Sequence, residues 1–130
     1  MSTKIGQNLS NCYSINFSLP KRSNKKIKFI IIHYTGMKIE SSAIKKLCDA
    51  KSKVSSHYFI KNSGKILNLV PEAYTAWHAG ISCWKGIKFL NKNSIGIEIN
   101  NPGHLNGYNH FYKKQIVSLI ILLKYLIRKY

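Results

Sequence analysis

The stretch F-I-I-I-H-Y-T, residues 29–35, decides the fold of this chain because a short apolar run ends there in polar residues. Such a run, rich in β-branched residues, is typical of a strand buried on both faces in an α/β domain. His33 follows the run directly, and α/β folds carry their sites at the ends of such strands. We therefore predict a strand over residues 28–34 with a candidate functional histidine. A histidine that only bonds a nearby backbone carbonyl fits the position equally well.

The residues that follow this strand supply further elements. A helix is predicted from residue 41 to about 51, with buried positions at helical spacing. Two strands, over 54–61 and 65–70, are joined by the turn N-S-G at 62–64 and form a hairpin.

A long loop over residues 71–93 separates the hairpin from two final elements. Isoleucines alternate with polar or small residues over 94–100, which predicts a strand with Glu98 on the face opposite the isoleucines. Helical spacing over 111–129 predicts a last helix that is apolar on more than one face. The element order predicts an α/β fold with a mixed central sheet flanked by helices.

Composition indicates one globular domain, with 45% hydrophobic residues among 130. We predict an extended N-terminal arm over residues 1–24 and a domain over 25–130. The formal net charge of +17 would attract polyanions, but no motif for specific nucleic-acid binding accompanies it. Three widely spaced cysteines and the absence of a secretory signal in residues 1–10 favour the cytoplasm. The most apolar stretch, 116–127, is too short for a membrane span.

Glu98 is one of only four acidic residues, and it lies in an otherwise apolar strand. Burying an unpaired carboxylate is costly, so either a cation meets it or it faces a cleft with a raised pKa. The second arrangement suits a general base. In a chain with 21 Lys and Arg residues, an ion pair is an equally strong expectation.

Two other histidines, His57 and His78, are also considered as candidate site residues. His57 lies within a predicted hairpin strand, where a structural role is favoured. His78 follows Trp77 on the long loop, which suits a groove for sugar rings, although a buried tryptophan that pins the loop is equally expected. A hydrolytic zinc needs three protein ligands, and histidine spacing alone does not identify three here.

Six segments, taken together and in order, resemble the type-2 N-acetylmuramoyl-L-alanine amidases, relatives of the peptidoglycan recognition proteins. They are I-I-H-Y-T at 31–35, S-S-H-Y-F-I at 55–60, G-K-I-L-N-L-V-P-E at 64–72, A-W-H-A-G-I-S-C-W at 76–84, L-N-K-N-S-I-G-I-E-I at 90–99 and N-P-G-H-L-N-G-Y at 101–108.

The resemblance implies a zinc-dependent hydrolase that cuts the amide between N-acetylmuramic acid and L-alanine, with peptidoglycan or muropeptide as partner. His33 matches the first zinc ligand. Glu98 matches the catalytic glutamate that activates the metal-bound water. The residues that match substrate-binding or scaffold positions around the groove are His57, Trp77, His78, Asn93 and Asn101.

Family members continue past the last helix into a segment that supplies two more zinc ligands, whereas this sequence stops at Tyr130. We therefore expect an amidase fold that lacks its C-terminal portion and has His33 as its one family ligand. The alternative function is a catalytically inactive remnant that binds peptidoglycan or muropeptide. Intact wall and recycled anhydro-muropeptide both stay open as substrates.

Overall fold

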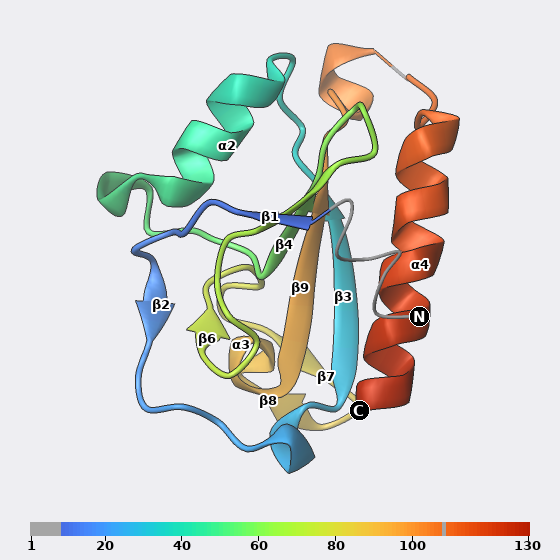
Figure 1. Cartoon of the computed structure of the whole chain (residues 1–130). Helices are drawn as coiled ribbons and strands as arrows, with labels where there is room; N and C mark the ends of the chain where they lie inside the picture. The colour runs from blue at the N-terminus through green and yellow to red at the C-terminus, as the bar shows by residue number, and fades with distance from the viewer. Residues whose placement is uncertain (1–8, 108) are drawn as a thin grey trace.

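The computed structural model describes residues 9–107 and 109–130, and its centre is a five-stranded sheet of order β1-β5-β4-β9-β3 (Figure 1). These strands are β1 (Leu9–Asn11), β3 (Phe29–Tyr34), β4 (Tyr58–Ile60), β5 (Ile66–Asn68) and β9 (Ser94–Ile99). β9 is parallel to both β3 and β4, and β1 is parallel to β5. β4 and β5 form the antiparallel hairpin. The predicted mixed sheet is confirmed.

Two helices cover the two faces of the sheet (Figure 1). On one face, α4 (Lys113–Lys129) buries Leu122 and Leu126 against alternate residues of β4, β5 and β9. On the other face, α2 (Glu40–Cys48) buries Ala43 and Leu47 against the intervening residues of β4 and β5. The two-residue period of the strands therefore divides the apolar side chains between two cores.

Short elements give structure to the segments between the main strands. β2 (Phe17–Ser18) pairs with β6 (Thr75–Ala76), and β7 (Cys83–Trp84) pairs with β8 (Ile87–Lys88). The remaining short elements are α3 (Leu90–Asn93) and the 3-10 turns η1 (Asn24–Lys26), η2 (Ala50–Ser52) and η3 (His104–Asn106). Within the described residues, no helix is long and apolar enough to cross a lipid bilayer.

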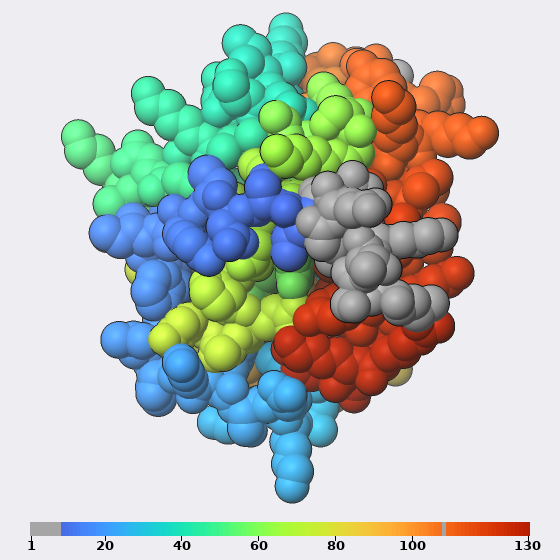
Figure 2. Space-filling model, in the orientation of Figure 1, coloured from blue at the N-terminus to red at the C-terminus, as the bar shows by residue number. Residues whose placement is uncertain are grey.

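The N-terminal segment lies against the domain from residue 9 onward. β1 joins the edge of the sheet, and Ser14, Asn16 and Arg22 are buried. Figure 2 shows this segment, in blue, lying flat on the surface. The predicted arm over 1–24 is thus extended and paired where it is described, and its first eight residues lie outside the described part. As a domain boundary, residue 24 stays a prediction.

The expectation that the 28–34 strand is buried on both faces is wrong. None of the β3 residues is fully buried, and Ile32 is 47% exposed. The reason is the position of β3 at the edge of the sheet, where β9 is its one strand partner among the described residues. The predicted character of the last helix is confirmed, because Val117, Ile120 and Ile127 of α4 are exposed while its opposite side is buried.

The hairpin turn is where α4 begins its packing on the sheet. Gly64 has a φ of +84°, and a Cβ on it would lie 2.8 Å from the carbonyl oxygen of Lys114 in the first turn of α4. Ser118 Oγ donates to the Gly64 carbonyl at 2.5 Å, and Gln115 Nε2 donates to the Asn100 carbonyl at 2.8 Å. A side chain at position 64 would therefore push the helix away from the hairpin.

We expect Gly64→Ala to lower the free energy of unfolding by about 2–4 kcal/mol, from backbone strain together with the clash. Gly86→Ala is the matched control, since Gly86 also has a positive φ, of 77°, but a Cβ there meets nothing within 4 Å. That variant should lose only about 1 kcal/mol. Urea denaturation of both variants checks this, and equal losses would show that α4 does not depend on the close approach.

Candidate active site

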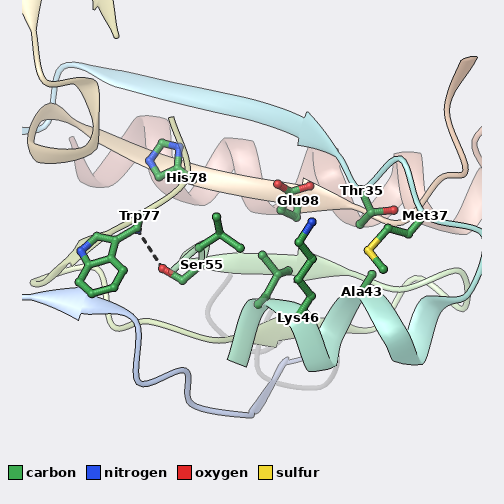
Figure 3. Close-up of a pocket in the computed structure, with 10 residues that line it drawn as sticks. Thr35, Met37, Ala43, Lys46, Ser55, Trp77, His78 and Glu98 are labelled. Atoms are coloured by element: carbon green, nitrogen blue, oxygen red, sulfur yellow. Dashed lines mark hydrogen bonds between the residues drawn. The ribbon is translucent and has the colours of Figure 1, made fainter. Parts of the chain in front are cut away.

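The site is built at the carboxyl end of the parallel pair β3 and β9. His33 is the register partner of Glu98, so both side chains leave the sheet on the same face, the one that α2 covers. A pocket of about 160 Å³ lies between this face and α2 (Figure 3). Its lining residues are Thr35, Met37, Ala43, Lys46, Leu47, Val54, Ser55, Trp77, His78 and Glu98.

The Glu98 carboxylate lines the pocket and has one buried oxygen, Oε2. Its Oε2 has no hydrogen-bond partner among the described residues. Burial raises the pKa of Glu98 from its ordinary 4.5 to about 7, and the nearby charge of Lys46 opposes this rise. Figure 3 shows Lys46 extending from α2 toward the carboxylate, although the two do not form an ion pair. Of the two arrangements left open by the sequence, the cleft-facing acid is therefore the one observed.

His33 and His78 are joined by a hydrogen bond whose direction can be assigned. The Ser94 hydroxyl donates to the Leu90 carbonyl at 2.6 Å, so at its 3.1 Å contact with His78 Nε2 it is the acceptor. His78 therefore carries its proton on Nε2 and accepts at Nδ1. His33 Nε2 donates to that Nδ1 at 3.0 Å. Burial lowers the pKa of both rings, that of His78 to about 3 with further contributions from the neighbouring His57 and His33.

A glycine in β9 makes room for the His78 ring. A Cβ on Gly96 would lie 2.4 Å from His78 Cγ, so the ring packs directly on the strand backbone. The loop that carries His78 is fixed by Asn91, whose Oδ1 accepts from the amides of His78 and Ala79 at 3.1 and 2.8 Å. The sequence A-W-H-A-G thus depends on residues 91 and 96 for its position.

His57 lies beneath the site and is 0% exposed. Its Nδ1 accepts from the Gly96 amide at 3.0 Å, so Nε2 carries the proton and faces the Tyr74 carbonyl at 3.0 Å. The Arg22 guanidinium is 2.8 Å from the same Nε2. Burial and this positive charge lower the pKa of His57 to about 3. Both ring nitrogens are in contact with groups inside the fold, so His57 supports the site, and a direct role in substrate binding stays a prediction.

Trp77 lines the pocket, and its role in substrate binding stays a prediction. Its amide donates to Ser55 Oγ at 2.9 Å (Figure 3). Its indole Nε1 donates to Ser18 Oγ at 2.7 Å. The backbone of Trp77 is therefore fixed by Ser55 and its ring by the N-terminal Ser18, and the residue is only partly buried.

Asn93 and Asn101 do not meet the other candidates in this pocket. Asn93 Nδ2 caps the carbonyls of Lys88 and Phe89, both at 3.3 Å, near α3. Asn101 is buried, bonds the Gly103 amide and the Asn109 carbonyl, and lines a separate cavity with Tyr34 and His104. Both residues hold loops, and a direct role in ligand binding stays a prediction.

The donor set is too small for a complete catalytic metal centre. Within residues 9–107 and 109–130, no group of three or more His, Cys, Asp or Glu side chains could hold a metal ion. A catalytic zinc has three protein ligands. His33 and His78 offer two nitrogens at most, so the described residues alone do not fit such a centre.

Two residues of the site were missed by sequence reasoning. Lys46 is one of two adjacent lysines in α2, and only the rotation of the helix, set by buried Ala43 and Leu47, turns it to the pocket. Arg22 lies in the predicted N-terminal arm, yet it is buried against backbone carbonyls. The helical period predicts a buried stripe in this helix but does not distinguish Lys46 from Lys45, and no sequence signal marked Arg22.

Comparison with known proteins gives consistent matches. Residues 23–130 match the Amidase_2 family, described as N-acetylmuramoyl-L-alanine amidase. N-acetylmuramoyl-L-alanine amidase AmiD of Escherichia coli is 42% identical over 117 residues, which is 81% of this chain and 41% of AmiD.

Two solved structures are also similar. The complex of Escherichia coli AmiD with the substrate anhydro-N-acetylmuramic acid-L-Ala-D-gamma-Glu-L-Lys has a TM-score of 0.73 at 37% identity, over 87% of this chain and 48% of that one. AmpDh3 from Pseudomonas aeruginosa has a TM-score of 0.74 at 29% identity, over 89% of this chain and 50% of that one.

The chain spans about two fifths of the length of curated AmiD and about half of each of these two solved chains. Both the family match and the mixed sheet with its covering helices agree with the resemblance seen in the sequence. The chain belongs to the N-acetylmuramoyl-L-alanine amidase family.

Proposed function

We propose that this chain carries out amidase chemistry on muropeptides, hydrolysing the amide between N-acetylmuramic acid and L-alanine. One observation carries the proposal: the buried, unpartnered Oε2 of Glu98 in a pocket beside His33. A carboxylate with a pKa of about 7 is poised to take a proton near neutral pH. Family membership supplies the reaction class.

Glu98 is the general base of this proposal. Its Oε2 receives the proton of the water that attacks the amide carbonyl, and returns a proton to the departing amine of L-alanine. The pocket between α2 and β9 holds the peptide side of the substrate and limits the access of bulk water to the carboxylate. Trp77, fixed by its two hydrogen bonds, offers an aromatic face for the sugar side.

A zinc requirement is a further part of the proposal, with His33 as one ligand. Family resemblance supports it, and the accessible end of β3 puts His33 beside the proposed base. The described residues do not complete the ligand set, so no step of the reaction above passes through a metal.

Muropeptide binding without turnover is the second candidate function. The lack of a three-ligand group among the described residues favours it, since the pocket and Trp77 would serve binding without any metal. The anhydro-muropeptide named in the AmiD complex is the natural probe for both candidates. A cytoplasmic location, supported by three free cysteines at positions 12, 48 and 83, stays a proposal.

The first test is release of the free stem peptide from anhydro-muropeptide, followed by mass spectrometry. We expect release that a zinc chelator abolishes, and a loss of about 10²–10⁴-fold in Glu98→Gln, because the base is removed while its shape is kept. Glu40→Gln is the control, since Glu40 pairs with Lys61 outside the pocket.

His33→Ala should lower the zinc content of the purified chain, which elemental analysis measures.

In the release assay, tight ligand binding without release by the parent chain would select the binding function. Equal release by the parent chain and Glu98→Gln would remove Glu98 from its role.

A second test uses stability, and it needs no substrate. In the folded chain burial favours the protonated form of Glu98, whose pKa is about 7, whereas in the unfolded chain the carboxyl group ionises near 4.5. As pH rises from 4.5 to 7, the unfolded state is therefore favoured progressively.

Glu98→Gln is neutral at every pH, so we expect equal stability of both chains near pH 4. Above pH 7 the variant should be more stable by about 3 kcal/mol. Urea denaturation from pH 4 to 8, with a chelator present, measures the difference. A constant difference across this range would mean that the carboxylate is not held in a costly environment.

A further inference from the structure

We propose that Lys46 is a specificity-determining residue, which binds a carboxylate on the peptide part of the substrate while Glu98 acts on the amide. The inference rests on the proposed function, because it takes a muropeptide as the ligand of this pocket. It adds a charged residue of α2 to the candidate residues on β3, on β9 and on the loop that carries Trp77 and His78.

The pocket has an acidic side chain on one wall and a basic side chain on the opposite wall. Glu98 projects from β9 on one wall, and Lys46 projects from α2 on the other (Figure 3). Apart from His78, they are the ionisable side chains among the lining residues. The rest of the lining is apolar or small and polar. A ligand in this pocket therefore meets one fixed cation and one acid on opposite sides.

Neither charge is satisfied by the described part of the protein. The ion pairs found there are Lys61 with Glu40 and Lys129 with Glu72, and neither involves the pocket. Glu98 Oε2 has no hydrogen-bond partner, although Lys46 is close enough to influence its pKa. An ammonium that points into a pocket without an ion-pair partner is available to an anionic group of a ligand.

The direction of Lys46 is set by packing. Ala43 and Leu47 are buried against the sheet, at 1% and 7% exposure, and fix the rotation of α2. Lys46 lies three residues after Ala43 and one before Leu47, so it stands at the pocket edge of this buried stripe. Lys45 and Lys46 are both exposed and carry the same charge, but of the two only Lys46 lines the pocket.

Muropeptides carry a free carboxylate close to the amide bond that is cut. In the ligand named in the AmiD complex, the second peptide residue is a γ-linked glutamate. A γ-linkage uses the side-chain carboxyl and leaves the α-carboxylate free, one residue beyond the L-alanine whose amide is cut. Contact of that carboxylate with Lys46 would fix the peptide relative to Glu98, and it would select acidic stem peptides over amidated ones.

Binding of two ligands by isothermal titration calorimetry tests this inference. The first is anhydro-N-acetylmuramic acid-L-Ala-D-γ-Glu-L-Lys, and the second is the same compound with the γ-Glu α-carboxylate amidated. A chelator is present, so that binding is measured without turnover. The proteins are the parent chain, Lys46→Met, Lys46→Arg and the control Lys45→Met, each checked for cooperative thermal unfolding.

We expect the parent chain to bind the carboxylate ligand about tenfold to hundredfold more tightly than the amidated ligand. Lys46→Met should lose this preference by weakening only the carboxylate ligand. Lys46→Arg should keep most of the preference, and Lys45→Met should behave as the parent chain does.

Two outcomes would overturn the inference, and they are distinguishable. A preference for the carboxylate ligand that survives in Lys46→Met would remove Lys46 from this role and leave the proposed function intact. No binding of either ligand by the folded parent chain would remove the proposed function, and the role of Lys46 with it.

Discussion

The parallel register of β3 with β9 is the constraint on which the site depends. Ile95, Ile97 and Ile99 are buried under α4, and this burial obliges Gly96 and Glu98 to face α2. A shift of one residue would place the carboxylate in the α4 core and the isoleucines in the pocket, at a large cost in free energy. The apolar side chains of one face therefore hold the reactive side chain on the other.

The loop that completes the site is held mainly by polar contacts. Arg22 donates to the carbonyls of Glu72 and Asn91, and the Asn91 side chain in turn fixes the amides of His78 and Ala79. Burial lowers the pKa of Arg22 to about 10, which reflects the cost of taking a guanidinium from water. The planar guanidinium binds these two carbonyls through three hydrogen bonds, and this offsets that cost. An N-terminal residue is thereby part of the support for the pocket.

Residue patterns were sufficient to predict the sheet, the hairpin and both long helices, because strand and helix periods are local properties. They were also sufficient to single out Glu98, since a carboxylate among isoleucines is costly wherever it lies. They failed for the burial of β3, which depends on what lies beside the strand. They could not show that His57 is enclosed while His78 faces the pocket, because Arg22 and Gly96 decide that difference from distant positions. Lys46 required the rotation of α2, and so could not be told from Lys45 before the packing was known.

The unpaired state of Glu98 is itself informative in so basic a chain. With 21 Lys and Arg residues against four acids, a cation beside this carboxylate would be easy to supply, and Glu72 has one in Lys129. Hydrogen bonds from Lys129, Tyr130 and Tyr58 lower the pKa of Glu72 against the opposing effect of its burial. A carboxylate whose pKa is lowered by such hydrogen bonds is stable, but it is too weak a base to take a proton near neutral pH. The Oε2 atom of Glu98 lacks such a partner, and burial raises its pKa. The same burial that lowers the folding stability of the chain therefore allows Glu98 to accept a proton near neutral pH.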